Sequence, residues 1–152
     1  IRNNQNREKG NLIHFCLSKI NYKWDVEMAI NQLINLGLIQ PNEPEQFRNM
    51  IEKVVNHPVL EEYFSSKYEL RLETEILMPN GNSLRPDRIM IEKNKAHIID
   101  YKTGDQNDSH MIQIKTYAQI LGLMGYEIEK LFLVYITAIN IDILEVKTDN
   151  SI

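Results

Sequence analysis

The chain has 152 residues, of which 43% are hydrophobic and 25% are charged, and its formal net charge is −4 at pH 7. These values are ordinary for one globular domain with a real core, and the negative charge weighs weakly against a free-standing nucleic-acid binder. No apolar run approaches the roughly 20 residues that span a bilayer, and the polar start lacks a signal peptide, so we expect a cytoplasmic protein without a membrane partner. The single cysteine, Cys16, excludes an internal disulfide and a four-cysteine iron–sulfur cluster built by this chain alone.

The first 65 residues carry the 3.6-residue periodicity of amphipathic helices. His14 lies on or beside the apolar stripe of the first helix. Asp25 is a candidate N-cap of the second helix and Gly37 a candidate stop, while Pro44 opens a third helix that must end near Pro58. Helices are predicted over 7–20, 24–39 and 44–58, with a short further turn over 59–64.

From residue 66 onward the pattern changes to strands joined by turn residues. The Asn-Gly pair at 80–81 is typical of a hairpin turn, and Gly125 closes a later helix. We predict a single domain over 1–152, with a helical segment (1–65) and a sheet core (66–152), in a mixed α/β fold with a central mixed sheet flanked by helices. The predicted strands are 68–78, 83–92, 96–103, 130–137 and 141–147, and the predicted helix is 111–125.

Three charged residues fall on strands that otherwise read as buried. Asp87, Asp100 and Lys102 need partners or a function, because an unpaired buried charge costs several kcal/mol. A two-residue loop at Asn94 and Lys95 sets Asp87 opposite Lys102 and places all three side chains on one face of the hairpin. A four-residue loop keeps that pairing, whereas an odd loop length breaks it.

Two carboxylates on one face repel each other unless a cation lies between them. Hard oxygen ligands select Mg²⁺ or Mn²⁺ over zinc, so the pattern predicts a divalent metal held by Asp87 and Asp100. Such an ion lowers the pKa of a bound water, and Lys102 can orient that water or offset developing negative charge. Phosphodiester hydrolysis fits all three residues, and an ordinary salt-bridge cluster is the alternative.

The strings "RPD" (85–87) and "IIDYK" (98–102) resemble the PD-(D/E)xK nuclease signature. The longer pattern "PDRIMI…HIIDYKTG…QIKTY" resembles the RecB-type nuclease domain at the C-terminus of UvrD/Rep-like helicase-nucleases such as RecB and AddA. This resemblance implies a restriction-endonuclease-like core in which Asp87 and Asp100 are metal ligands and Lys102 is the catalytic lysine.

The same resemblance implies roles for four further residues. His14, in "KGNLIHFCL", is an additional metal ligand, and the backbone carbonyl of Tyr101 completes the inner shell. Gln113 and Tyr117 match a "QxxxY" motif, whose spacing puts both on one helix face, where they brace the site or contact DNA. Leu84 departs from the pattern, since related domains often carry glycine there.

An acidic residue on the first strand also recurs in these domains, and Glu75 is the nearest match. A three-residue loop at 80–82 places Glu75 opposite Asp87, whereas a two-residue Asn-Gly turn rotates it to the other face. Glu73 shares the parity of Glu75 and is the substitute. His110, beside the polar loop before the last helix, is a weaker candidate for contact with DNA.

The resemblance implies a Mg²⁺-dependent DNA exonuclease that acts on single-stranded ends in double-strand-break recombination repair. Because the chain starts with Ile rather than Met, we expect a fragment of a longer helicase-nuclease, with its helicase portion and possibly a second subunit as partners. A stand-alone endonuclease and a catalytically idle DNA-binding or docking module are the alternatives; Lys102 argues against the idle module, because binding alone does not require it.

Overall fold

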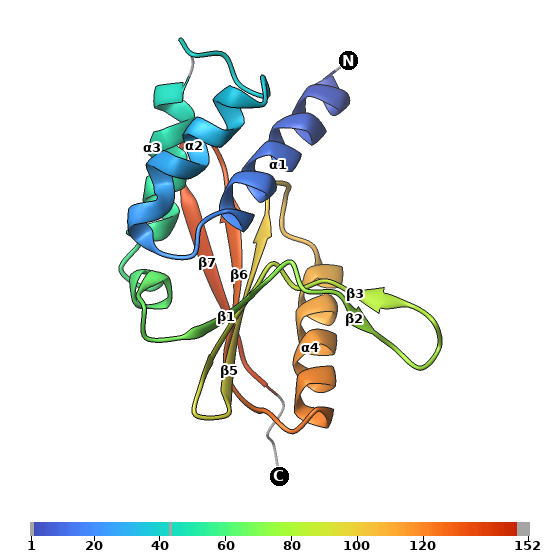
Figure 1. Cartoon of the computed structure of the whole chain (residues 1–152). Coiled ribbons are helices and arrows are strands. Elements are labelled where there is room, and N and C mark those ends of the chain that lie inside the picture. Colours follow the sequence, from blue (N-terminus) through green and yellow to red (C-terminus); the bar gives the residue numbers. More distant parts are fainter. Residues whose placement is uncertain (1, 43, 149–152) are drawn as a thin grey trace. The chain divides into compact units, whose positions relative to one another are not determined.

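The structure, a computed structural model, describes residues 2–42 and 44–148 (Figure 1). It divides into two compact units. The first runs to Lys67 and includes Ile136–Ile141, and the second runs from Tyr68 to Tyr135 and resumes at Asp142. Within the described ranges, no helix combines the length and apolar character needed to cross a membrane.

The first unit is helical, as the periodicity predicts. Its α-helices are α1 (Arg2–Ser18), α2 (Val26–Asn35) and α3 (Pro44–Val55), and its 3-10 turns are η1 (Lys23–Asp25) and η2 (Glu61–Phe64). The helix α1 begins five residues earlier than predicted. The buried side chains of α3 recur at helical spacing along one face: Phe47, Met50, Ile51, Val54 and Val55.

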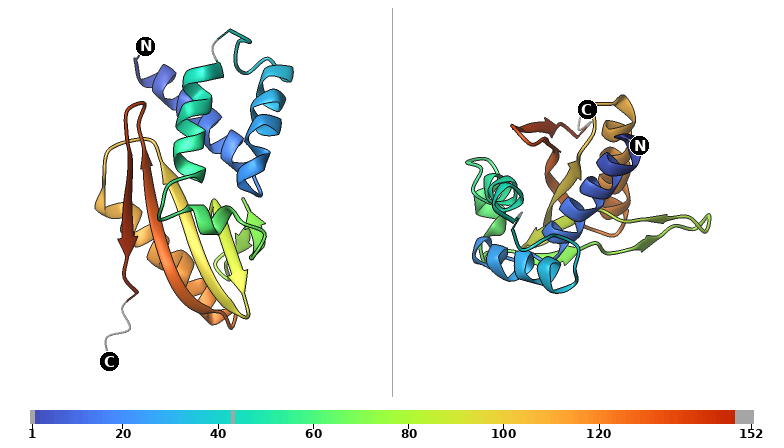
Figure 2. Two further views of the ribbon diagram at one scale, coloured as in Figure 1. Left: turned by 90° about the vertical axis from the view of Figure 1, so that its left-hand side faces the viewer. Right: turned by 90° about the horizontal axis from the view of Figure 1, so that it is seen from above.

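The second unit is built on a five-stranded sheet in the order β1-β4-β5-β6-β7. Strands β4 and β5 are antiparallel, whereas β5 and β6 are parallel and are joined by the helix α4. A two-stranded pair, β2–β3, extends away from this sheet as an arm (Figure 2). The mixed α/β fold class is therefore confirmed. The bounds are β1 (Glu69–Leu72), β2 (Ile76–Leu77), β3 (Ser83–Leu84), β4 (Arg88–Glu92), β5 (Lys95–Lys102), α4 (Asp108–Leu123), β6 (Glu127–Ile136) and β7 (Ile141–Val146).

The β4–β5 turn differs from the predicted one by one position. Lys93 and Asn94 form the two-residue loop, with φ of 48° and 66°, the left-handed values that such a turn needs. Glu92 therefore pairs with Lys95, and Arg88 pairs with Ile99. This corrects the predicted pairing of Asp87 with Lys102, because the observed register brings Asp87 opposite Asp100. The register shift is two residues, so the face on which each side chain lies is unchanged.

The hairpin between residues 68 and 92 is not continuous. At Glu73 the backbone adopts φ 51°, and the ladder breaks into β1–β4 and β2–β3 on either side. A loop of three residues, Pro79 to Gly81, closes the arm, since the Met78 amide donates to the Asn82 carbonyl at 2.8 Å. The Glu73 amide donates to the Asp87 carbonyl at 3.1 Å, which places Glu73 opposite Asp87.

The helix α4 covers one face of the sheet. It begins at Asp108, three residues before the predicted start, because the Asn107 side chain accepts a hydrogen bond from the Ser109 amide at 2.9 Å. The apolar cluster between α4 and the sheet includes Ile114 and Leu121 from the helix and Ile98 from β5. Side chains two residues apart along a strand share a face, so Asp100 and Lys102 continue the face that carries Ile98.

Candidate active site

Asp87 and Asp100 come from the ends of two neighbouring strands. Asp87 immediately precedes β4, and Asp100 lies two residues before the end of β5. The Oδ2 atom of Asp87 accepts a hydrogen bond of 2.7 Å from the Tyr101 amide, which fixes the first carboxylate beside the second strand. The Asp100 residue is only 3% exposed. Two carboxylates therefore meet at one place on the sheet, one of them almost fully buried.

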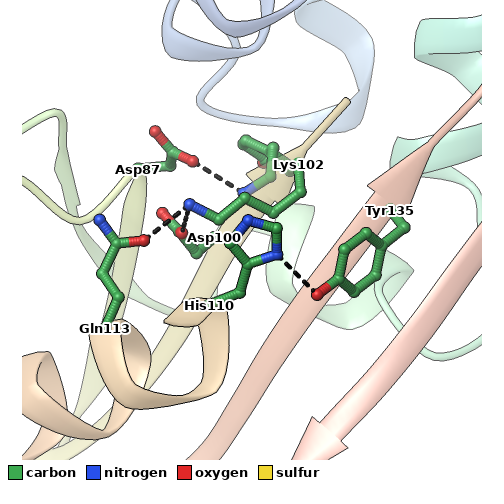
Figure 3. Close-up of polar contacts among 7 residues, drawn as sticks. Asp87, Asp100, Lys102, His110, Gln113 and Tyr135 are labelled. Carbon is green, nitrogen blue, oxygen red and sulfur yellow. Dashed lines mark hydrogen bonds and ion pairs between the residues drawn. The ribbon is translucent and has the colours of Figure 1, made fainter. Parts of the chain in front are cut away.

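Lys102 connects the strand to the helix that covers it (Figure 3). Its Nζ atom donates to Oε1 of Gln113 at 2.6 Å and lies 2.9 Å from Oδ2 of Asp100. The contact with Asp100 is an ion pair without hydrogen-bond alignment, because the buried Oδ2 atom has no aligned donor. The lysine is thus held between a neutral acceptor on α4 and a carboxylate on its own strand.

Tyr117 lies one helical turn after Gln113 and is 4% exposed. Burial raises the pKa of its phenol, and the charges of Asp100, Asp87 and then Glu73 raise it further. The tyrosine therefore stays protonated and can donate a hydrogen bond toward this negative region. The structure brings both residues of the predicted pair to the same side of the sheet as the carboxylates.

Tyr101 stands between Asp100 and Lys102, so its backbone lies at the site while its side chain points to the opposite face of the sheet. Burial raises the pKa of its phenol, the Arg88 guanidinium lowers it, and Asp87 is the first of the carboxylates that raise it again. The amide of Tyr101 already donates a hydrogen bond to the Asp87 carboxylate. The use of the Tyr101 backbone carbonyl as a metal ligand stays a prediction.

The structure does not bring Glu75 opposite Asp87. Glu75 is exposed in the link between β1 and β2, and the loop that closes the arm starts one residue earlier than either loop considered for it. Glu73, the substitute, occupies the position opposite Asp87 and is half-buried, with its Oε2 atom 4.0 Å from Nη1 of Arg85. The acidic residue that lies opposite Asp87 is therefore Glu73, directly after β1.

A histidine that the sequence interpretation ranked low also lies at the site. His110 is in the first turn of α4, and its Nδ1 atom is 2.9 Å from the hydroxyl of Tyr135, which pairs with Lys102 across β5 and β6. Burial lowers the pKa of the imidazole, the Lys102 ammonium lowers it further, and Asp100 acts in the opposite sense. The N-cap signal of Asn107 in the sequence would have placed this histidine on the helix.

The sequence matches the PD-(D/E)XK nuclease superfamily over residues 2–142, most of the chain. The chain belongs to this superfamily. A search of curated proteins found no match. Among solved structures, the crystal structure of SSO0001 is similar, with 22% identity and a TM-score of 0.37 over 89% of this chain and 66% of that one. This chain thus spans slightly less than two thirds of that protein's length.

PD-(D/E)XK nucleases generally use divalent metals, and the residues at this site fit such an ion. Asp87 and Asp100 supply the hard oxygen donors that Mg²⁺ and Mn²⁺ prefer, and the Oδ2 atom of Asp100 is buried without an aligned donor. No three His, Cys, Asp or Glu side chains gather as a metal cage within the described residues. A metal here would therefore need backbone or water oxygens besides the two carboxylates, as Mg²⁺ sites usually do.

His14 belongs to the first unit, whereas the carboxylates belong to the second. It is half-buried on α1, and its Nδ1 atom lies 3.0 Å from the Gly10 carbonyl oxygen. A carbonyl can only accept, so Nδ1 carries the hydrogen and Nε2 carries the lone pair. Metal-binding histidines in general have one ring nitrogen oriented by such a hydrogen bond, and the role of His14 as a metal ligand stays a prediction.

Proposed function

We propose that this domain is a divalent-metal-dependent deoxyribonuclease that hydrolyses DNA phosphodiester bonds. The observation that carries the proposal is the position of Lys102. Its ammonium group contacts Gln113 and Asp100 on the same face of the sheet as the Asp87 side chain. The chain also belongs to the PD-(D/E)XK nuclease superfamily. A DNA-binding or docking module would not need a lysine fixed beside the carboxylates of Asp87 and Asp100.

Each residue of the site has a distinct part in the proposed reaction. Asp87 and Asp100 would hold Mg²⁺ or Mn²⁺, with the Tyr101 carbonyl and water oxygens as further ligands. A bound divalent ion would supply positive charge next to the scissile phosphate and make a coordinated water more acidic. Lys102 places its ammonium beside Asp100, where it can donate a hydrogen bond to the attacking water or to a phosphate oxygen.

Residues on α4 would position these groups rather than react. Gln113 accepts a hydrogen bond from Lys102, which restricts the rotamers of a long side chain. Tyr117 stays protonated at neutral pH because burial and nearby carboxylates raise the pKa of its phenol, so it can act only as a neutral donor or acceptor. Glu73, opposite Asp87, adds negative charge that favours a bound cation.

The finer proposal is a RecB-type exonuclease within a longer helicase-nuclease. Its support is the similarity of "PDRIMI", "HIIDYKTG" and "QIKTY" to that nuclease domain. In this setting the helicase portion delivers single-stranded ends, in double-strand-break repair in the cytoplasm. An exonuclease needs an end, so the domain should degrade linear single strands and leave circular ones intact, whereas a stand-alone endonuclease would cut both.

The test is cleavage of a labelled single-stranded oligonucleotide by the purified protein during titration with Mg²⁺ or Mn²⁺. Wild type should cut only with the metal, and Lys102→Ala should not cut. Lys130→Ala is the matched control, because Lys130 contacts Glu145 at 2.9 Å, the same distance as Lys102 to Asp100, on the strand β6. Metal-independent cleavage, or Lys102→Ala cutting as fast as Lys130→Ala, would contradict the proposal.

A further inference from the structure

A short segment joins α1 to α2 (Figure 1), and it carries the chain's only tryptophan, Trp24. Trp24 is 62% exposed, although an indole is among the side chains whose burial gains most from the hydrophobic effect. The first unit buries the aromatic residues Phe47, Tyr63 and Phe64 in its core, while Phe15 and Tyr22 are half-buried. The core therefore gives no reason for the position of Trp24.

Trp24 is part of a preformed aromatic stack. Its ring lies on that of Tyr22, with centroids 4.9 Å apart and planes inclined at 29°. The Oδ2 atom of Asp25 accepts hydrogen bonds from the amides of Tyr22, at 2.9 Å, and Asn21, at 3.2 Å, and the Asp25 amide donates back to the Tyr22 carbonyl at 2.9 Å. The turn is thus fixed before any ligand arrives, so a ligand that stacks there orders little of the protein.

Two lysines lie near the stack in the sequence, Lys23 between Tyr22 and Trp24 and Lys19 three residues before Tyr22. Lys19 and Lys23 are exposed, and the Nζ atom of Lys19 lies 5.0 Å from the centroid of the Phe15 ring. The nearby carboxylates are already engaged. The Asp25 carboxylate accepts hydrogen bonds from backbone amides, and the Oε1 atom of Glu27 lies 2.7 Å from Nε of Arg48. An exposed aromatic ring with exposed lysines nearby in the chain is complementary to an unpaired base carrying its phosphates.

We infer that Trp24, stacked on Tyr22 and close in the sequence to the exposed Lys19 and Lys23, is a binding site for an unpaired base of single-stranded DNA. Every base has a π-face, so stacking on Trp24 does not select a sequence, while the lysines contact the backbone phosphates. This site is separate from the residues that would perform cleavage. The choice of DNA as the ligand rests on the proposed function.

The absence of a second tryptophan makes the emission of Trp24 a direct probe of its own site. The whole protein, in EDTA so that no strand is cut, is titrated with a single-stranded oligonucleotide, and the tryptophan emission is followed. The same oligonucleotide, labelled, gives Kd by fluorescence anisotropy. Quenching of Trp24 should saturate at the concentration at which anisotropy saturates.

Variants separate stacking from charge. Trp24→Ala should raise Kd about 5- to 100-fold, and Trp24→Phe should recover part of the loss. Leu36→Ala is the matched control, since Leu36 is also 62% exposed, and it should leave Kd unchanged. An oligonucleotide of abasic sites should bind wild type and Trp24→Ala equally, because it has nothing to stack. Lys23→Gln should weaken both oligonucleotides alike and flatten the salt dependence.

The outcomes distinguish this site from the proposed function. Binding without quenching, with Kd unchanged in Trp24→Ala, would overturn the site and leave the nuclease proposal intact. Failure of wild type both to bind the oligonucleotide and to cleave it in Mg²⁺ would overturn both. Anionic lipid vesicles that change the Trp24 emission where the oligonucleotide does not would assign this surface to a membrane instead and refute the inference.

Discussion

Replacing Gln113 by alanine tests whether α4 positions the catalytic lysine. The change removes the 2.6 Å hydrogen bond from the Lys102 ammonium and leaves its contact with Asp100. A hydrogen bond from a charged donor contributes about 1.5–3 kcal/mol, and partial exposure of the Lys102 side chain, at 20%, reduces this to about 1–2 kcal/mol. If that energy fixes Lys102 in the transition state, kcat should fall about 5- to 30-fold.

The assay is metal-dependent cleavage of a labelled single strand, with kcat and KM measured separately. KM should change little, because Gln113 acts through Lys102 rather than on DNA. The control Gln119→Ala, at an exposed position of the same helix, should behave as wild type. A double-mutant cycle of Gln113→Ala with Lys102→Met, followed by chemical denaturation, measures the coupling directly. Coupling below about 0.3 kcal/mol, or an equal loss of kcat in Gln119→Ala, would refute the reasoning.

Three further predictions follow from other contacts. Glu73→Gln should weaken divalent-metal binding and cleavage about tenfold, whereas Glu75→Gln should not, because only Glu73 lies opposite Asp87; equal effects in a metal titration would contradict this placement. Asp87→Ala should lower the free energy of unfolding by about 1–3 kcal/mol, because the Tyr101 amide loses its acceptor, and Asp87→Asn should restore most of that stability without restoring cleavage. Burial raises the pKa of the Cys16 thiol from 9.0 to about 12, so its contribution to stability is complete below pH 9.0 and is lost as the pH rises toward 12. Buried Tyr101 and Tyr117 also lower the stability at high pH, so denaturation at a series of pH values should show a steeper fall in wild type than in Cys16→Ala, with a difference of at most ~1.4 kcal/mol per pH unit.

The elements that could be predicted from the sequence are those fixed by periodicity. Five apolar residues at helical spacing on α3 are the five that the helix buries. The prediction that Asp87 and Asp100 lie on one face of the sheet was correct although the predicted turn was wrong by one position. The resulting register error was two residues, and side chains alternate between the faces with period two. Patterns that repeat along a segment tolerate local errors of this kind.

Features set by single backbone dihedrals were beyond prediction. Lys93 adopts φ 48° and Glu73 adopts φ 51°, values for which neither residue type has a preference, and these two positions decide the β4–β5 turn and the break in the first hairpin. The exchange of Glu75 for Glu73 has another cause: the loop at 79–81 starts one residue earlier than the loops considered, which shifts the pairing by two residues. The position of His110 could have been found, because Asn107 before Asp108 is a readable helix start.

The β4–β5 turn also has a consequence for the order of folding. A hairpin with a two-residue loop forms within about 1–10 μs, whereas the parallel pairing of β5 with β6 must wait for the long connection through α4. Asp87 and Asp100 therefore meet in a local unit before the rest of the sheet is assembled. We expect substitutions in β6 to slow folding without altering how the two carboxylates are paired, so that the chemistry of the site depends on one short, early-forming segment.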